Sequence, residues 1–170
     1  MRMLRSPQRF QHIGNMGDQR AFNKRKNDFY AYTYTTLSPR VTVGGVTGRM
    51  IEKKDGFKTK NPSLPAYRKT SDIYFAPGEN GYASQAKLFG ANGKMCLDFD
   101  WSHTHTNQDG TVFPKGTVHV QEYRVSKIRD PKSGKLIDGF KRVKKARRMT
   151  PAEIMKYGPI LHHFNPDIKF

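Results

Sequence analysis

Short segments rich in β-branched and aromatic residues, separated by turn signals, run through most of the chain and restrict the folds open to it. Residues 83–89 and 95–101 flank Ala91-Asn92-Gly93-Lys94, whose Asn-Gly pair is typical of tight hairpin turns. A second hairpin is expected around Asp130-Pro131-Lys132-Ser133-Gly134. The same pattern predicts further strands at residues 29–36, 41–43, 49–51, 72–76, 117–125 and 136–143. Strands joined by such short turns form an antiparallel sheet.

Helical signals are confined to the two ends of the chain. Thr150-Pro151-Ala152-Glu153 is a capping box with proline at the first helical position, and Gly158-Pro159 predicts that this helix ends near Tyr157. Residues 1–28 show little apolar periodicity and are expected to form a basic N-terminal arm or short helix. We therefore expect an α+β fold: a twisted antiparallel β-sheet, the N-terminal arm or helix, and a short C-terminal helix. Residues 29–170 are expected to form one domain.

Charge is distributed unevenly along the 170 residues, which carry a formal net charge of +17. Residues 1–70 hold 15 Lys and Arg against 4 Asp and Glu, and residues 126–170 hold 12 against 4. Residues 71–125 hold 4 against 6. Two basic flanks therefore enclose a slightly acidic centre. Such an excess of positive charge favours a polyanionic partner, because each neutralised phosphate of a nucleic acid releases condensed counterions.

Other sequence features exclude some classes of protein. Cys96 is the only cysteine, so an internal disulfide and a cysteine-based zinc site are ruled out. No apolar run approaches the roughly 20 residues of a membrane-spanning helix, and no apolar stretch typical of a signal peptide follows the charged first residues. We expect a cytoplasmic protein, acting in its own cell or in a target cell, with no membrane partner and no cofactor.

The acidic centre holds the residues best suited to catalysis or metal binding. Asp98 and Asp100 are expected on one face of a strand, and His103 and His105 share a face if that strand continues. His119 follows on the next strand, after a polar loop. The candidate catalytic residues are His103, His105, Lys115, His119 and Asp100.

These side chains match the needs of RNA hydrolysis. A base removes the 2′-hydroxyl proton, an acid protonates the leaving 5′-oxygen, and a cation stabilises the charged phosphorane. Histidine suits both proton-transfer roles because its ordinary pKa lies near neutrality. Two alternatives stay open: the histidines with an aspartate also match three-His or two-His-one-carboxylate metal sites, or they are exposed strand ends without a chemical role.

Clusters of Lys and Arg in the basic flanks are candidate phosphate contacts. Residues 141–148 hold six cations, and residues 20–26 hold four. The candidate nucleic-acid-binding residues are Arg20, Lys24, Arg25, Lys26, Lys141, Arg142, Lys144, Lys145, Arg147 and Arg148. Tyr30, Tyr32 and Tyr34, on one face of a predicted strand, form either a base-stacking surface or an ordinary half-buried strand face.

An ordered set of short motifs over residues 61–125 carries a resemblance to a known family. The motifs are Leu64-Pro65-Ala66-Tyr67, Ser71-Asp72-Ile73-Tyr74, residues 87–94, residues 97–101 and Val118-His119-Val120. Together they resemble a domain of phage-associated and polymorphic-toxin proteins, similar to the barnase–EndoU–colicin–RelE group of metal-independent ribonucleases. The resemblance implies RNA cleavage by the histidines. Val118 stands where the motif usually has Pro-His, and Gln121 replaces one histidine of its closing pair.

The sequence thus predicts an endoribonuclease of the toxin or phage-effector kind that cleaves RNA by histidine acid–base catalysis. Its expected partners are RNA, such as tRNA or rRNA, together with an immunity protein or a larger delivery polypeptide. Two alternatives remain: a non-enzymatic nucleic-acid-binding protein associated with phage or ribosome, and a metal-dependent nuclease using Asp98, Asp100 and the histidines.

Overall fold

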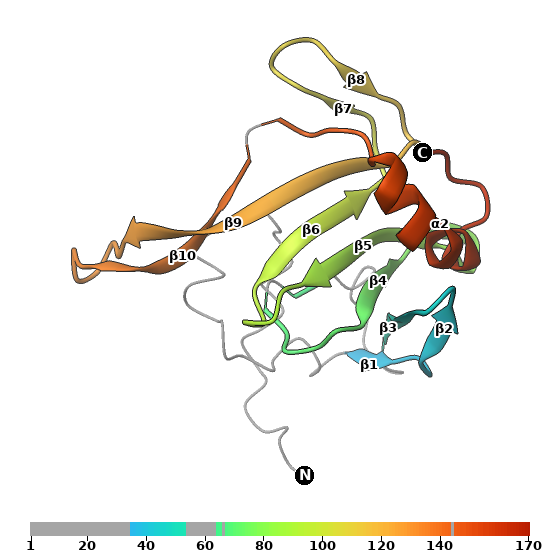
Figure 1. Cartoon of the computed structure of the whole chain (residues 1–170), viewed down its shortest axis with the longest axis horizontal. Helices are drawn as coiled ribbons and strands as arrows, with labels where there is room; N and C mark the ends of the chain where they lie inside the picture. Colours follow the sequence, from blue (N-terminus) through green and yellow to red (C-terminus); the bar gives the residue numbers. More distant parts are fainter. Residues whose placement is uncertain (1–34, 54–63, 66, 144) are drawn as a thin grey trace.

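A computed structural model describes residues 35–53, 64–65, 67–143 and 145–170. Within these ranges the protein is mostly β-sheet with one α-helix near the C-terminus (Figure 1). The elements are β1 (Thr35–Leu37), β2 (Val41–Val43), β3 (Val46–Lys53), β4 (Ile73–Pro77), the 3₁₀ turn η3 (Glu79–Gly81), β5 (Ala83–Phe89), β6 (Met95–Asp100), β7 (His105–Thr106), β8 (Val112–Phe113), β9 (His119–Arg129), β10 (Leu136–Arg142) and α2 (Pro151–Phe164). The predicted α+β class is confirmed at this level, whereas the basic arm of residues 1–28 lies outside the described residues.

Eight strands form the main sheet in the order β1-β3-β4-β5-β6-β9-β10, with β2 also paired to β3. Neighbouring strands from β4 to β10 pair antiparallel, as the hairpin turns predicted. The expectation of a wholly antiparallel sheet is wrong at one place, because β3 and β4 pair parallel. Residues 54–72 connect these two strands, and a connection of that length permits the crossover that parallel pairing requires.

The helix α2 begins as the sequence predicts and ends later. Thr150 accepts a hydrogen bond from the Glu153 amide and Glu153 accepts one from the Thr150 amide, which confirms the capping box. The predicted end near Tyr157 is wrong, since the helix continues through Pro159 to Phe164. Pro159 lies on the exposed side, and the turn that follows it buries Ile160 and Leu161 completely. This burial offsets the hydrogen bond that proline cannot donate.

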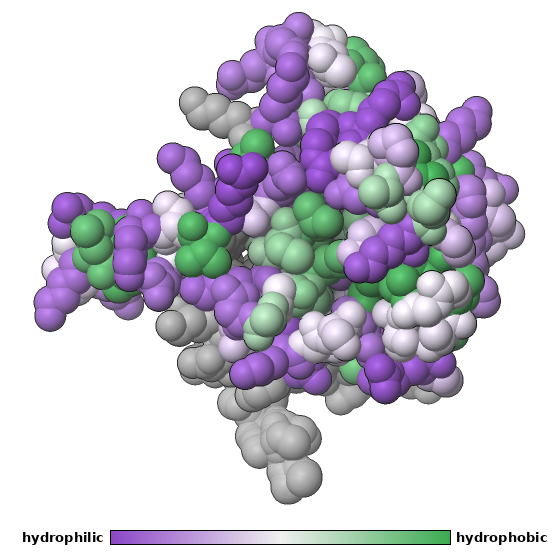
Figure 2. All heavy atoms as spheres, viewed as in Figure 1, coloured by the Kyte–Doolittle hydropathy of each residue, from purple (hydrophilic) through white to green (hydrophobic). Residues whose placement is uncertain are grey.

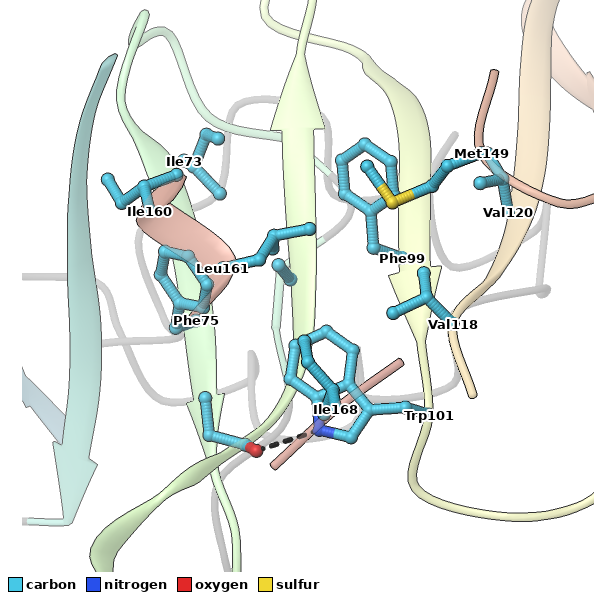
Figure 3. Close-up of a cluster of buried hydrophobic side chains, with 12 residues drawn as sticks. Ile73, Phe75, Phe99, Trp101, Val118, Val120, Met149, Ile160, Leu161 and Ile168 are labelled. Carbon is cyan, nitrogen blue, oxygen red and sulfur yellow. Dashed lines mark hydrogen bonds between the residues drawn. The ribbon is translucent and has the colours of Figure 1, made fainter. Parts of the chain in front are cut away.

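The main hydrophobic core lies between α2 and one face of the sheet (Figure 3). Phe75 and Phe99 of the sheet are fully buried, as are Ile160 and Leu161 of the helix. Helix and sheet approach closely at Gly48, where a Cβ atom would lie 2.8 Å from the Phe75 ring and 2.9 Å from Ile160. Any larger residue at position 48 would therefore separate the two layers.

Trp101 closes the core at the end of β6, next to the segment that follows α2. Its indole N–H donates to the Ala83 carbonyl over 2.9 Å, drawn as the dashed line in Figure 3. Its side chain packs with Val118 and Ile168 in the core cluster. A buried indole with a satisfied N–H both stabilises the core and fixes the position of the chain leaving β6.

The β9–β10 hairpin extends well beyond the rest of the sheet (Figure 1). Val125 and Leu136 on it are more than half exposed, and Figure 2 shows hydrophobic atoms there among hydrophilic ones. The described residues hold no helix long and apolar enough to cross a membrane.

Candidate functional site

The face of the sheet opposite α2 carries buried polar side chains in two rows that cross β5, β6 and β9. One row pairs Gln85 with Asp100 and Asp100 with His119, and the next pairs Lys87 with Asp98 and Asp98 with Gln121. Lys87, Asp98, His119 and Gln121 are each at most 6% exposed. Buried polar groups are costly unless they are paired, so this block of side chains is the candidate functional site.

The turn after β6 places His103. The Asp100 carboxylate accepts hydrogen bonds from the Ser102 amide over 2.8 Å and from the Ser102 hydroxyl over 2.7 Å. The aspartate thus closes a local turn that ends the strand. His103 follows with its Nδ1 3.1 Å from the Ser102 hydroxyl and 3.6 Å from Asp100 Oδ1. The strand does not continue through His103 and His105, the condition under which the two would share a strand face, because this turn redirects the chain.

A small two-stranded ribbon, β7–β8, places His105. His105 Nε2 lies 3.2 Å from the side-chain oxygen of Asn107. Asn107 is buried, donates to the Ala146 carbonyl over 2.8 Å and accepts from the Ala146 amide over 3.0 Å. This pair of hydrogen bonds ties the ribbon to the segment before α2. Asn107 was not among the site residues predicted from the sequence.

His103, His105 and His119 converge at this end of the sheet. One ring nitrogen from each lies within 4.8 Å of the others. The His105 and His119 rings stack with centroids 4.7 Å apart, while the His103 ring meets His119 edge-on at 5.5 Å. Phe113 packs beside His119 at 5.7 Å. Three of the five predicted catalytic residues therefore form one cluster, and Asp100 adjoins it.

The buried member of the cluster is His119, which is 2% exposed. Burial lowers its pKa to about 4, opposed by the Asp100 carboxylate and reinforced by the two other imidazoles. Within the described residues, its Nδ1 atom is buried without a hydrogen-bond partner. A buried nitrogen without a hydrogen-bond partner on a neutral imidazole is suited to accept a hydrogen bond from a ligand.

Lys87 and Asp98 form an oppositely charged buried pair beside the histidines. Burial lowers the pKa of Lys87 to about 8, opposed by Asp98 and Asp100. Burial raises the pKa of Asp98 to about 7, opposed chiefly by Lys87. Gln85 links the rows by donating to Asp98 and Asp100, each over 3.2 Å. Lys87 was not among the predicted site residues, although it lies two residues from Gln85 on a predicted strand and so shares a face with it.

Lys115 is placed differently from the histidines. Its amide donates to the Thr104 hydroxyl over 3.2 Å, and its exposed side chain lines a pocket on the other side of Ser102. Among the described residues, no hydrogen bond joins the Lys115 side chain to the cluster. In the sheet, Lys87 instead supplies the nearby positive charge, because its row with Asp98 is the one next to the row that contains His119.

The predicted phosphate-binding residues separate into different groups. Lys141, Arg142 and Arg148 are exposed, and Lys145 pairs with Asp109 over 2.5 Å. Arg147 instead binds both oxygens of Glu153, over 2.7 and 2.9 Å, and Glu122 over 3.2 Å. Arg147 thus ties α2 to β9. The candidates outside the described residues are Arg20, Lys24, Arg25, Lys26 and Lys144.

Comparison of the chain with protein-family models, curated proteins and solved structures found no match. The chemistry of the site therefore rests on its own geometry. That geometry is a cluster of three imidazoles bordered by a carboxylate and a buried lysine–aspartate pair.

Proposed function

We propose that this protein is an endoribonuclease that cleaves RNA by acid–base catalysis at the cluster of His103, His105 and His119. The observation that carries the proposal is the convergence of these imidazoles around the unpartnered nitrogen of His119. Attack of the 2′-oxygen on the adjacent phosphorus requires one group that accepts the 2′-hydroxyl proton and a second that donates a proton to the leaving oxygen. Both groups must lie within a few ångströms of each other.

The environments of the histidines suggest their roles. Burial keeps His119 neutral at pH 7, so its lone pair accepts the 2′-hydroxyl proton as the 2′-oxygen attacks phosphorus. His103 is exposed and faces Asp100, so it donates a proton to the departing 5′-oxygen. The products are a 2′,3′-cyclic phosphate and a free 5′-hydroxyl. Asp100 orients His103 and Asn107 orients His105.

The surface charge supports RNA as the partner. The net charge of +17 favours a polyphosphate, and exposed Lys141, Arg142 and Arg148 supply phosphate contacts on the described surface. The resemblance of residues 61–125 to phage-associated and polymorphic-toxin ribonuclease domains supports an effector acting in a cytosol. In that setting, an immunity protein or a delivery polypeptide would be a further partner.

A metal-dependent hydrolase is a second candidate, favoured by one specific observation. Three imidazole nitrogens within 4.8 Å of one another match the donor set of a three-His zinc site, which leaves one position for water. The metal would then activate the attacking water, and the histidines would serve as ligands rather than as proton carriers.

Incubation of the purified chain with total RNA, with and without chelator, tests both candidates. We expect fragments with cyclic phosphate ends in either condition. Cleavage lost in chelator and restored by one added metal would replace the acid–base proposal with the metal-dependent one. RNA retarded in a gel but not shortened in any condition would contradict both and identify a nucleic-acid-binding protein.

A further inference from the structure

A pocket of about 470 Å³ lies at the same end of the sheet as the histidine cluster. Strands β4 and β6 end there and β5 and β9 begin there, and residues at these strand ends, in η3 and in the segment after α2 line the pocket. Its volume lies within the range of roughly 300–1,000 Å³ that small-molecule sites occupy. The catalytic roles proposed above do not use this pocket.

The pocket and the histidine cluster share a wall. Gln85 and Ser102 both line the pocket. Both also bind the Asp100 carboxylate, Gln85 over 3.2 Å and Ser102 over 2.7 Å. The Ser102 hydroxyl lies 3.1 Å from His103 Nδ1. A molecule held in the pocket therefore lies one side chain away from the proposed acid.

The chemistry of the lining indicates the class of ligand. Tyr82 is 39% exposed and offers an aromatic surface, while Trp101 is buried beneath with its N–H bound to Ala83. Glu79 and Asp167 are exposed carboxylates, which only accept hydrogen bonds when ionised. Lys115 adds one positive charge. An aromatic surface, acceptors and a cation together suit a nucleobase attached to a phosphate.

We propose that this pocket binds the nucleobase next to the scissile phosphate, which rests on the function proposed above and specifies its substrate. Tyr82 contacts the face of the base, Glu79 and Asp167 accept from its edge, and Lys115 binds a flanking phosphate. Adenine, cytosine and guanine carry an exocyclic amino donor that uracil lacks. The carboxylates therefore favour these three bases over uracil.

The single tryptophan of the chain lines the pocket and serves as the reporter. The full chain is titrated in chelator with AMP, CMP, GMP, UMP and inorganic phosphate while its fluorescence is recorded. We expect saturable changes with the first three nucleotides at concentrations about 5-fold or more below those needed for UMP, consistent with loss of one good hydrogen bond. Equal responses to phosphate alone and to nucleotides would reduce the pocket to an anion site and overturn the proposal.

Variants assign the interaction to the pocket. Tyr82→Ala should weaken nucleotide binding by about 5-fold to 100-fold, the range that base stacking on an aromatic residue contributes, while Tyr82→Phe retains it. Glu79→Gln combined with Asp167→Asn should remove the discrimination against UMP. Unchanged binding in both Tyr82→Ala and the double variant would overturn the proposal.

These experiments distinguish a failure of the pocket proposal from a failure of the proposed ribonuclease function. Nucleotide binding without RNA cleavage would uphold the pocket and contradict the ribonuclease. RNA cleavage without any nucleotide response, and with an unchanged KM in Tyr82→Ala, would uphold the ribonuclease and reject the pocket.

Discussion

The imidazole rings of His105 and His119 lie almost parallel, 20° apart, with their centroids separated by 4.7 Å. Two imidazolium rings in that arrangement would repel each other, so the His105 ring contributes to the lowered pKa of His119. The buried ring of His119 is the one whose pKa falls, to about 4. Burial, reinforced by the stacked ring of His105, therefore keeps the imidazole of His119 neutral at pH 7.

Replacing the histidines singly should separate their roles. His119→Ala and His103→Ala should each lower RNA turnover by about 10²-fold to 10⁴-fold in chelator, because each removes one proton-transfer group. Lys115→Ala should raise KM with a smaller effect on kcat, since Lys115 lies in the pocket and not in the cluster. His163→Gln, at an exposed position on α2, is the matched control. Wild-type rates in all the cluster variants would refute a catalytic role for the histidines.

The low pKa of His119 also predicts how stability depends on pH. Between pH 6.5 and about 4 the unfolded chain binds a proton at His119 and the folded chain does not. The contribution of His119 to the free energy of unfolding is therefore complete above pH 6.5 and is lost as the pH falls. We expect the free energy of unfolding in urea to fall between pH 7.5 and pH 4.5 by up to about 3 kcal/mol more in the wild type than in His119→Gln. Equal losses in the two proteins would contradict a depressed pKa.

Asn107 should matter for stability and for the geometry of the site together. Asn107→Ala leaves the buried amide and carbonyl of Ala146 without their partners, and each loss costs roughly 1–3 kcal/mol. The same change removes the hydrogen-bond partner of His105. We expect a lower midpoint of urea unfolding and a reduced kcat. Full activity at temperatures where the variant stays folded would show that His105 needs no such support.

The basic segment before α2 should divide into binding and structural residues. Neutralising Lys141, Arg142, Lys145 and Arg148 should weaken RNA binding for all sequences and flatten its salt dependence by about 0.7 log–log unit per lost contact. Arg147→Gln should instead cost about 1.5–3 kcal/mol of stability through its carboxylate partners. A salt slope that changes only in Arg147→Gln would reverse this assignment.

Local rules predicted much of this fold. The hairpin around Gly93, where φ is +83°, and the capping box at Thr150 each depend on a few adjacent residues, and both are confirmed. The parallel pairing of β3 with β4 depends on a connection whose path no local pattern reveals. The continuation of α2 past Pro159 depends on tertiary burial of Ile160 and Leu161, which overrides helix propensity.

The candidate site was predictable in its residues but not in its arrangement. Strand alternation correctly placed Asp98 and Asp100 on one face, and both carboxylates bind Gln85. The convergence of His103 and His105 with His119 depends on the turn closed by Asp100 and on the anchoring of Asn107 to Ala146. The burial of Lys87 was not predicted, because an isolated lysine in a strand is ordinarily exposed.

Strand β9 connects the histidine cluster to the far end of the molecule, which has a geometric consequence for the proposed function. Its first residue is His119 in the cluster and its last is Arg129, near the tip of the extended hairpin (Figure 1). Eleven residues of strand span about 33 Å. The strand pairs with β6 at its first four residues and with β10 beyond them, so it forms one continuous connection between the histidine cluster and the hairpin tip. For the ribonuclease proposed above, an RNA fold bound at the tip would then be cut at a constant distance from the tip.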